Sequence, residues 1–311
     1  MAIDLVTGAF SYSGRFLTEL LLQDGHRVRT LTNHPRPELF KGQVDVYPLR
    51  FDDDVLTKAL SAVDTVYNSY WVRFAYRRIG FDAAVRNSRA LIDAAHAAGV
   101  RRFVHVSIAN PSLDSPLPYY RGKAMVEQHL TGSGLSFAIA RPTVIYGEGD
   151  VLMNNIAWFI RHLPVVGIPG SGHYRIQPVF VRDHVDLLRN LAANDHPTIV
   201  DSVGPDAYTF EQLLKLIRRT LGRHVALIKL PPGVVLTVLK LVGTLVGDVI
   251  LTRDEIRGVM DDLLVSQAPP TGSTRFDTWL QAHASELGQR YASELQRHFA
   301  IGGSQRPRQP T

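Results

Sequence analysis

The chain contains no cysteine, which excludes disulfides, thiolate metal sites, iron–sulfur clusters and a cysteine nucleophile. It also lacks a Gly-x-Ser-x-Gly elbow and a His-Glu-x-x-His helix, so neither a serine hydrolase nor a metal site is predicted. The net charge of +5 comes without a block of Lys or Arg, which argues against nucleic-acid binding. The first residues have neither a basic segment nor a long apolar run, so we expect no targeting peptide and a cytoplasmic protein.

What the chain does contain is a regular alternation of short apolar strands and amphipathic helices, in 311 residues of which 45% are hydrophobic. Helices are predicted near residues 16–21, 55–60, 82–98 and 120–131, with another from about 183. This order is typical of a parallel sheet with helical crossovers, and we predict a doubly wound Rossmann-type α/β fold. The predicted strands are 3–6, 28–31, 44–47, 65–67, 103–106, 137–140, 179–181 and 199–200.

The alternation weakens after about Gly147, where proline and glycine become frequent. We expect a cofactor-binding domain over residues 1–204, within which residues 148–182 contribute to a second, smaller unit. Residues 205–311 are predicted to complete that unit as a mainly helical cap next to the substrate. The glycine- and proline-containing end, from about residue 302, is predicted to be a disordered tail.

Residues 234–251 form the longest apolar stretch and raise the question of a membrane. The stretch is interrupted by Lys240 and Asp248 and by Gly243 and Gly247. These residues favour a helix that is buried in the cap or lines an apolar pocket. Peripheral membrane contact through this stretch is the alternative.

A glycine-containing turn joins the first strand to the first helix, which is where a Rossmann fold holds a dinucleotide pyrophosphate. Gly8 suits the sharp bend, and Gly14 suits close packing of the helix. Ser11 stands in place of the usual middle glycine. The cofactor-binding residues predicted in this turn are Gly8, Phe10, Ser11, Tyr12, Ser13, Gly14 and the adjoining Arg15.

Residues 32–36, after the second strand, contain no carboxylate to bind a ribose 2′-hydroxyl. Asn33, Arg36 and Arg15 instead offer amide and cationic donors that suit a 2′-phosphate. We therefore favour NADP, with NAD as the alternative. A solvated surface role for the arginines remains open.

Tyr119 and Lys123 stand four residues apart at the start of a predicted helix. A lysine at this spacing is expected to lower the pKa of the phenol, so that Tyr119 moves a proton while Lys123 also binds the nicotinamide ribose. Such a pair is common by chance, but this one follows the fifth strand and Ser107. We predict Tyr119, Lys123 and Ser107 as catalytic residues, with strand-end capping as the alternative for Ser107.

Together these motifs resemble the extended or atypical branch of the short-chain dehydrogenase/reductase superfamily, which includes sugar-nucleotide epimerases and dehydratases. The resemblance covers residues 1 to about 204. Residues 68–74, 110–112 and 251–264 are similar to an epimerase-like group related to the NADPH-binding accessory subunit of respiratory complex I. The motifs that carry the wider resemblance are Thr7-Gly8 to Gly14, Asp52, Asn68, Val106-Ser107, Tyr119 with Lys123, Arg141-Pro142 and Gly147.

The resemblance implies that Asp52 contacts the adenine, that Asn68 and Ser69 line the cofactor and that Pro142 packs beside the nicotinamide. This chain departs from the pattern at Ile108 and Ala109, where many relatives carry the catalytic Ser or Thr. Ser112 is a candidate substitute.

The substrate is expected between the sheet and the cap, at the carboxyl ends of the strands. Arg73 is the candidate clamp for a phosphate or carboxylate, with a salt bridge as the alternative. The residues expected nearest the substrate are Trp71, Arg73, Phe74, Met153, Asn154, Trp158 and Gln177, although core packing explains the aromatic ones equally well.

The predicted function is NAD(P)-dependent hydride transfer to or from a carbonyl or hydroxyl carbon of a small molecule. One alternative is a sugar-nucleotide epimerase or dehydratase. The other is a non-catalytic NADP(H)-binding module of a larger assembly. A homodimer is also considered.

Overall fold

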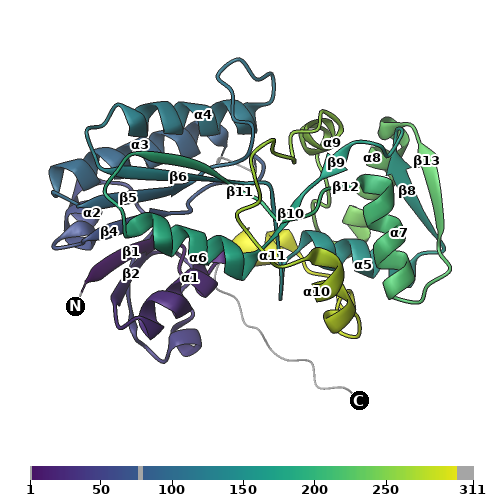
Figure 1. The fold of residues 1–311 in the computed structure, drawn as a ribbon, viewed down its shortest axis with the longest axis horizontal. Coiled ribbons are helices and arrows are strands. Elements are labelled where there is room, and N and C mark those ends of the chain that lie inside the picture. The colour runs from purple at the N-terminus through teal and green to yellow at the C-terminus, as the bar shows by residue number, and fades with distance from the viewer. Residues whose placement is uncertain (1, 76–79, 300–311) are drawn as a thin grey trace.

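Seven parallel strands form the central sheet of the computed structural model, which describes residues 2–75 and 80–299 (Figure 1). Their order is β11-β6-β5-β4-β1-β2-β3, so the winding direction reverses between β1 and β4. The carboxyl ends of β1 and β4 meet at this reversal, where Rossmann folds bind ligands. The strands are β1 (Ile3–Thr7), β2 (Arg27–Leu31), β3 (Val44–Tyr47), β4 (Thr65–Asn68), β5 (Arg102–Val106), β6 (Phe137–Pro142) and β11 (Thr198–Ser202). The predicted Rossmann-type fold is confirmed.

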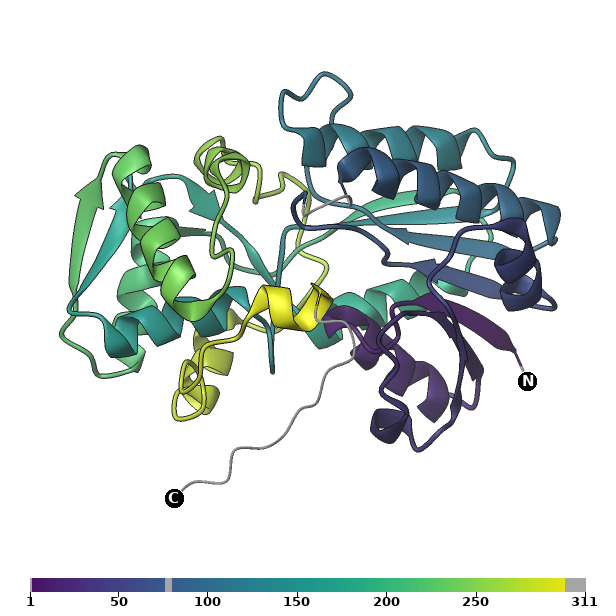
Figure 2. The ribbon, with the colours of Figure 1, turned by 180° about the vertical axis from the view of Figure 1, so that it is seen from behind.

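Helices cover both faces of the sheet. On one face lie α2 (Asp53–Leu60), α3 (Phe81–Ala97) and α4 (Pro118–Thr131), and on the other lie α1 (Tyr12–Gln23) and α6 (Val181–Ala192) (Figures 1 and 2). β4 is buried along its whole length, as expected for a strand covered on both faces. The short 3-10 helix η1 (Pro37–Phe40) precedes β3.

A second lobe follows the sheet, at the end of the molecule opposite the N-terminus (Figure 1). Its helices are α5 (Leu152–His162), α7 (Phe210–Thr220), α8 (Pro232–Val246), α9 (Arg253–Met260) and α10 (Phe276–His283). Short strand pairs connect or complete it: β7 (Val144–Tyr146) with β10 (Pro178–Phe180), β9 (Arg175–Ile176) with β12 (Tyr208–Thr209), and β8 (Val165–Pro169) with β13 (Ala226–Leu230). The helix α11 (Glu294–Phe299) returns toward the sheet lobe (Figure 2).

The β8–β13 pair is absent from our sequence prediction, which made the region after Tyr208 mainly helical. β13 is largely exposed and has no clear apolar alternation, so it gives little strand signal of its own. Its partner β8 lies far away in the sequence, and the two strands pair in parallel from Ala226–Val165 to Leu230–Pro169. Tertiary pairing, which local pattern does not report, stabilises this strand.

α8 corresponds to the apolar stretch at 234–251, and the favoured expectation of a buried helix is wrong. Only Val235 and Gly243 of α8 are buried, while Leu241 and Leu245 are 65% and 86% exposed. The helix does line a largely apolar groove, which was part of the same expectation. Within residues 2–75 and 80–299, no helix has the length and hydropathy needed to cross a bilayer.

The predicted division of the chain near residue 204 stays a prediction, as does the cytoplasmic location. The expected tail from residue 302 lies outside the described residues.

Candidate functional site

In the glycine turn after β1, the backbone at Gly14 lies unusually close to the backbone at Gly8. Gly8 has φ +72°, a conformation that favours glycine. A Cβ at Gly14 would lie 2.1 Å from the carbonyl oxygen of Gly8, so no other residue fits at position 14 without moving the backbone. The Gly8 carbonyl also accepts a hydrogen bond from the Ser11 amide at 2.8 Å. The turn is therefore tight, and it has no room for a side chain at position 14.

This turn suits the binding of a pyrophosphate. Ser11 is the N-cap of α1 but makes no side-chain cap hydrogen bond, and the first turn of α1 has no acidic residue. The N-terminal amides of a helix carry partial positive charge and attract anions. The close approach of Gly8 and Gly14, together with this helix terminus, fits a dinucleotide cofactor at the carboxyl end of β1.

The turn contains two aromatic residues, Phe10 and Tyr12, whose side chains pack within the protein. Phe10 is buried, and its ring centroid lies 5.7 Å from that of Phe40. Tyr12 packs edge-on against Phe16, with the ring centroids 5.9 Å apart. Their backbone remains part of the turn, while their side chains fix its position.

The two predicted arginines have different surroundings. Arg15 donates to the carbonyl of Glu148 and lies over the ring of Phe16, 4.6 Å from its centroid. It therefore contacts the loop after β7. Arg36 is exposed beside the end of β2, where the side chain of Asn33 accepts a hydrogen bond from the Leu49 amide at 3.0 Å. Of the two arginines, Arg36 lies on the β2 side, where a 2′-phosphate would be read.

Asp52 caps the helix that follows β3. Its carboxylate accepts a hydrogen bond from the Val55 amide at 3.1 Å and forms an ion pair with Arg50 at 3.0 Å. These contacts orient the side chain and stabilise α2. The adenine contact implied by the family resemblance stays a prediction.

Asn68 and Ser69 belong to a buried hydrogen-bond network that joins the carboxyl ends of β1, β4 and β5. The Thr7 hydroxyl lies 3.2 Å from Asn68 Oδ1 and accepts a hydrogen bond from the Ser69 amide at 2.8 Å. The Ser69 hydroxyl donates to the Thr7 carbonyl at 2.6 Å, and the Asn68 amide nitrogen lies 3.2 Å from His105 Nδ1. The network holds the strand ends that form the floor of the site.

Sequence reasoning missed His105, and it used Thr7 only as part of the glycine motif. Burial lowers the pKa of His105 well below its usual value, so the imidazole is neutral near pH 7. Its Nε2 is buried and has no hydrogen-bond partner among the described residues. The sequence around a histidine in a strand does not show whether its side chain packs in the core or joins a polar network. The sequence pattern therefore did not identify His105 as part of the site.

Lys123 lies at the centre of the candidate catalytic group. Its side chain is buried, and Nζ donates to the Val106 carbonyl at 2.8 Å. The same ammonium lies 4.5 Å from the ring centroid of Trp71. A cation over an indole face in a buried position is held by electrostatic attraction. Lys123 is thus fixed between the end of β5 and Trp71.

Trp71 packs against the start of α4, where its ring lies against both Tyr119 and Lys123. Its ring centroid is 5.9 Å from that of Tyr119 and 6.4 Å from that of Phe81. A Cβ at Gly122 would lie 3.1 Å from the indole, so glycine at this position makes room for it. Trp71 Nε1 is buried without a hydrogen-bond partner in the described part of the chain. The predicted substrate residue Trp71 therefore lies within the catalytic group itself.

The expected lowering of the Tyr119 pKa is wrong for this structure. Burial raises the pKa of the Tyr119 phenol above its ordinary value, and the nearby Tyr120 and Glu255 act in the same direction. Burial lowers the pKa of Lys123 to about 7. The spacing argument assumed that the ammonium faces the phenol, whereas here the ammonium lies against Trp71 and the Val106 carbonyl.

Replacing Lys123 by Met should therefore stabilise the protein near neutral pH. The unfolded state binds a proton at Lys123 with a pKa of 10.5, whereas in the folded state this value is about 7. The resulting destabilisation is fully present below about pH 7 and disappears as the pH rises to 10.5. We expect the melting temperature of Lys123→Met to exceed that of the wild type by about 2 °C or more at pH 7. The difference should shrink at pH 10, and equal melting temperatures at pH 7 would argue against the buried ammonium.

Ser107 is buried directly after β5, and its hydroxyl has no hydrogen-bond partner among the residues described. An unpaired buried hydroxyl is costly unless a ligand or water satisfies it, which fits a bound group at this position. Ser112, the candidate substitute, is exposed and accepts a hydrogen bond from the Asp114 amide. Ser107 therefore remains the predicted catalytic serine.

Pro142 is the last residue of β6, the strand that pairs with β5 in the sheet. Its carbonyl accepts a hydrogen bond from the Ala109 amide at 2.9 Å. Ile108 is buried and belongs to a small apolar cluster with Leu117 and Tyr120. Ile108, one of the two residues that depart from the family pattern, thus packs against the start of α4.

Arg73 forms ion pairs rather than an open clamp. Its Nε lies 2.6 Å from the Glu255 carboxylate, and its Nη1 lies 3.8 Å from a second carboxylate, that of Glu294. Its Nη2 donates to the Ile250 carbonyl at 2.9 Å. These contacts join the loop after β4 to α9 and α11. They favour the salt-bridge alternative for Arg73.

Three other predicted substrate residues hold C-terminal segments in place. Asn154 donates to the Arg290 carbonyl at 2.9 Å and accepts from the Gly288 amide at 3.0 Å. Trp158 packs against Tyr291, with the ring centroids 5.4 Å apart. Gln177 donates to the Gly204 carbonyl at 2.9 Å and accepts from the Ser266 amide at 3.1 Å. Sequence gave no sign of these partners because they lie 27 to 136 positions away.

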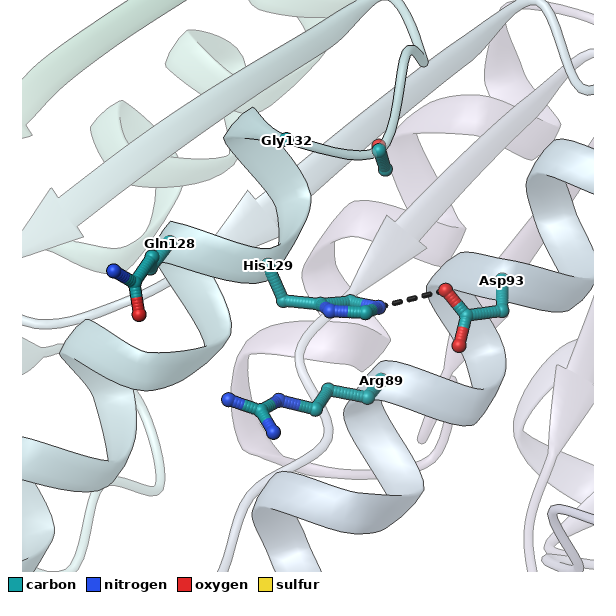
Figure 3. Close-up of a pocket in the computed structure, with 6 residues that line it drawn as sticks. Arg89, Asp93, Gln128, His129 and Gly132 are labelled. Carbon is teal, nitrogen blue, oxygen red and sulfur yellow. Dashed lines mark hydrogen bonds and ion pairs between the residues drawn. The ribbon is translucent and has the colours of Figure 1, made fainter.

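A separate hollow of about 400 Å³ lies on the outer surface between α3 and α4 (Figure 3). His129 and Asp93 face each other across it at 2.6 Å. It lies at the opposite end of α4 from Tyr119 and is not part of the site described above. Among the described residues there is no group of three or more His, Asp and Glu that would hold a metal.

The fold and this site define a dinucleotide-binding protein of the short-chain dehydrogenase/reductase type. The chain belongs to the NAD-dependent epimerase/dehydratase family, whose model matches residues 5–201. The resemblance inferred from the motifs is therefore confirmed.

Curated relatives of this chain have names that indicate different functions. Subunit 9 of the NADH dehydrogenase (ubiquinone) 1 alpha subcomplex, mitochondrial, from Arabidopsis thaliana is 25% identical over 240 residues, which cover 73% of this chain and 60% of the relative. The chain thus spans about three-fifths of the length of that relative. A ceramide reductase of Caulobacter vibrioides is 28% identical over 242 residues, 74% of each chain.

Solved structures confirm the fold. A nucleoside-diphosphate-sugar epimerase from Staphylococcus aureus superposes with a TM-score of 0.66 at 16% identity, covering 90% of this chain and all of that one. MoeE5 in complex with UDP-glucose and NAD gives a TM-score of 0.63 at 21% identity, covering 74% of this chain and 85% of that one. At these identities the likeness concerns the fold alone.

Proposed function

We propose that the protein is an NAD(P)-dependent oxidoreductase that transfers hydride to or from a carbonyl or hydroxyl carbon. The observation that supports the proposal is that Lys123, one turn after Tyr119 in α4, donates to the Val106 carbonyl beside Ser107 at the end of β5, in the same sheet that carries the Gly8–Gly14 turn after β1. Two groups needed for carbonyl reduction, a proton donor and an anion-binding turn, thus belong to one edge of the sheet. The family assignment supports the same chemistry.

The chain's own residues have distinct roles in this proposal. The turn of Gly8, Ser11, Ser13 and Gly14 binds the pyrophosphate, and Arg36 and Asn33 bind a 2′-phosphate. When bound, the nicotinamide supplies or accepts the hydride. Tyr119 protonates the substrate oxygen during reduction, and Ser107 donates a hydrogen bond to the same oxygen. The raised pKa of Tyr119 keeps the phenol protonated but makes it a weaker acid, so in this proposal binding of cofactor and substrate must lower that pKa before the proton is donated.

Lys123 has two tasks in the proposed site: it binds the nicotinamide ribose and restores the proton of Tyr119. With a pKa of about 7, its amine is able to give and take a proton near neutrality. To do so it must leave the face of Trp71. Separation of Lys123 from Trp71 is therefore part of the proposed binding event.

We favour NADP over NAD and an apolar carbonyl compound as substrate. The segment after β2 has no carboxylate, and Arg36 is exposed there. Trp71 and Phe81 surround the proton donor Tyr119 with aromatic surface. Two relatives bear names of this chemistry, the ceramide reductase and a 3β-hydroxysteroid dehydrogenase/isomerase of Mycobacterium tuberculosis. The latter is 28% identical over 185 residues, 48% of each chain.

A second candidate function is a non-catalytic NADP(H)-binding module of a larger assembly. Trp71 lies against Lys123 and beside Tyr119, and Ile108 and Ala109 replace the usual serine position. The similarity to a subunit of NADH dehydrogenase also supports this candidate. In it, Lys123 and Trp71 would only hold the bound nucleotide.

Deuterium transfer separates these candidates. The purified protein is incubated with NADPH carrying deuterium at C4, together with long-chain and steroid ketones, and the alcohols are analysed by mass spectrometry. Deuterium in an alcohol is the expected result. Tightly retained NAD without net NADPH oxidation would favour an epimerase, and NADPH binding without transfer would favour the non-catalytic module.

A further inference from the structure

Residues 250–265 of the second lobe, which include α9, contact three segments of the candidate site. Arg73, in the loop after β4, pairs with a carboxylate of this stretch at 2.6 Å. Asn110, in the loop after β5, donates to two of its backbone carbonyls at 3.0 and 2.8 Å. A Cβ at Gly258 would lie 3.2 Å from Tyr120, at the start of α4. The second lobe is thus attached to the segments that carry the proposed catalytic residues.

The carboxylate that pairs with Arg73 belongs to Glu255, which is fixed by its place in α9. Its Oε1 accepts a hydrogen bond from Arg73 Nε at 2.6 Å. Its Oε2 accepts from the backbone amide and the hydroxyl of Thr252, both at 2.8 Å, and so completes the capping box of α9. Because both oxygens are engaged, the carboxylate cannot follow Arg73 if the loop after β4 moves. The ion pair therefore ties this loop to the end of a helix.

Two more contacts hold the guanidinium of Arg73. Its Nη2 donates to the Ile250 carbonyl at 2.9 Å, and its Nη1 lies 3.8 Å from the Glu294 carboxylate of α11. Arg73 and Glu255 are both half-buried, so their attraction is screened less than that of an exposed ion pair. Separating them costs more than breaking a surface salt bridge.

The ion pair acts on a segment that has no regular structure. Trp71, Val72 and Arg73 lie outside the helices and strands and make no backbone–backbone hydrogen bond with another described residue. Their position therefore depends on side chains, above all on the Trp71 ring against Lys123 and on Arg73 against α9. Two residues span at most about 7 Å of chain. The position of Arg73 thus limits how far Trp71 can move away from Lys123.

The ion pair also lies near the phenol of Tyr119. Burial is the main cause of the raised pKa of Tyr119, while Glu255 raises this pKa further and Arg73 lowers it. Interactions between charges are largely screened beyond about 10 Å. The pair and the Trp71 ring, whose centroid is 5.9 Å from that of Tyr119, are therefore neighbours within one site.

We propose that Arg73 is a positioning residue, which together with Glu255 holds Trp71 against Lys123 until the cofactor binds. Lys123 must separate from Trp71 to bind the nicotinamide ribose, so the ion pair opposes cofactor binding. Breaking the pair raises the fraction of molecules in which Lys123 is available, and the apparent affinity for the cofactor rises in proportion. The inference rests on the proposed function, because only there does Lys123 bind the cofactor.

Acrylamide quenching of fluorescence tests the hold on Trp71 without any cofactor. Trp158→Phe combined with Trp279→Phe leaves Trp71 as the single tryptophan of the full chain. In this background, Arg73→Gln should raise the quenching constant about twofold or more, because the indole leaves its packed position more often. Arg73→Lys keeps the charge of the pair and should restore a value close to that of the background.

Calorimetric titration with NADPH, in the chain with its native tryptophans, tests the consequence for binding. Arg73→Gln should bind NADPH about threefold more tightly than the wild type, or better. Arg101→Gln is the matched control, because Arg101 also pairs with two carboxylates, Asp64 at 2.9 Å and Asp195 at 2.5 Å. Arg101 directly precedes β5, at the opposite end of that strand from the site. Its substitution should change neither the quenching nor the affinity.

Glu255→Gln is a second variant that keeps the experiment decisive if Arg73→Gln does not fold. Glutamine also completes a capping box, so α9 is retained while the ion pair is lost. It should raise the quenching and the NADPH affinity as Arg73→Gln does. If the background with a single tryptophan does not fold, the affinities of the variants with native tryptophans decide.

Unchanged quenching in both variants would overturn the hold on Trp71. Raised quenching without tighter binding, in a protein whose wild type binds NADPH, would overturn the role of Arg73 in the site. No binding of NADPH by any form would contradict the proposed function and with it the role of Lys123. The quenching result separates that failure from a failure of the contact itself.

Discussion

Substitution of Gly14 by Ala is expected to abolish dinucleotide binding. The added Cβ would lie 2.1 Å from the Gly8 carbonyl oxygen and 2.9 Å from its carbon, both backbone atoms that have no side-chain freedom. The turn must therefore open, which moves the helix terminus away from the pyrophosphate. Calorimetric titration with NADPH should show a loss of affinity of at least tenfold.

Two further variants separate this effect from unfolding. Gly233→Ala is the matched control, because a Cβ at that position meets no atom within 4 Å and binding should be unchanged. Ser13→Asp puts a carboxylate in the first turn of α1, where it favours the helix but repels a phosphate. It should keep or raise the melting temperature while it weakens NADPH binding. Wild-type affinity in both Gly14→Ala and Ser13→Asp would show that the cofactor does not bind at this turn.

Tyr119→Phe is expected to lower turnover about a hundredfold or more, with little change in NADPH affinity. The substitution removes only the hydroxyl that donates the proton, while the ring contacts with Trp71 and Phe81 are retained. Single-turnover and steady-state rates with the substrate found by deuterium transfer provide the measurement.

The neighbouring Tyr120 supplies the control. Tyr120 is buried, and its ring packs near Gly258 of α9 and in the cluster with Ile108 and Leu117. Tyr120→Phe should keep most of the activity. Equal losses in the two variants would mean that packing at the start of α4, and not proton donation, limits the rate.

The sheet and the glycine turn were predictable from the sequence because both depend on local patterns. Apolar runs such as Ile3 to Val6 gave the strands, and the position of Gly8 and Gly14 after the first run gave the turn. The structure confirms these elements, with boundaries shifted by one or two residues. The strand predicted at residues 199–200 is also confirmed, and the structure pairs it with β6 in the sheet.

Features that depend on distant contacts were not predictable in the same way. Lys123 and Tyr119 have the expected spacing, but the Lys123 ammonium lies against Trp71, and burial raises the pKa of the Tyr119 phenol instead of lowering it. The sequence left Arg73 open between an anion clamp and a salt bridge, and only the fold brings Glu255 and Glu294 beside it. The exposure of α8 likewise follows from what packs against it, which hydropathy alone does not reveal.

We expect a nicotinamide dinucleotide to bind at the Gly8–Gly14 turn with its reactive end near Tyr119. The most direct test is calorimetric titration of the nucleotide-stripped protein with NADPH and NADH in parallel, after identification of any nucleotide released on denaturation. We predict that NADPH binds, and binds more tightly than NADH, because the segment after β2 offers Arg36 and no carboxylate. No binding of either nucleotide would contradict the account and every catalytic role assigned with it.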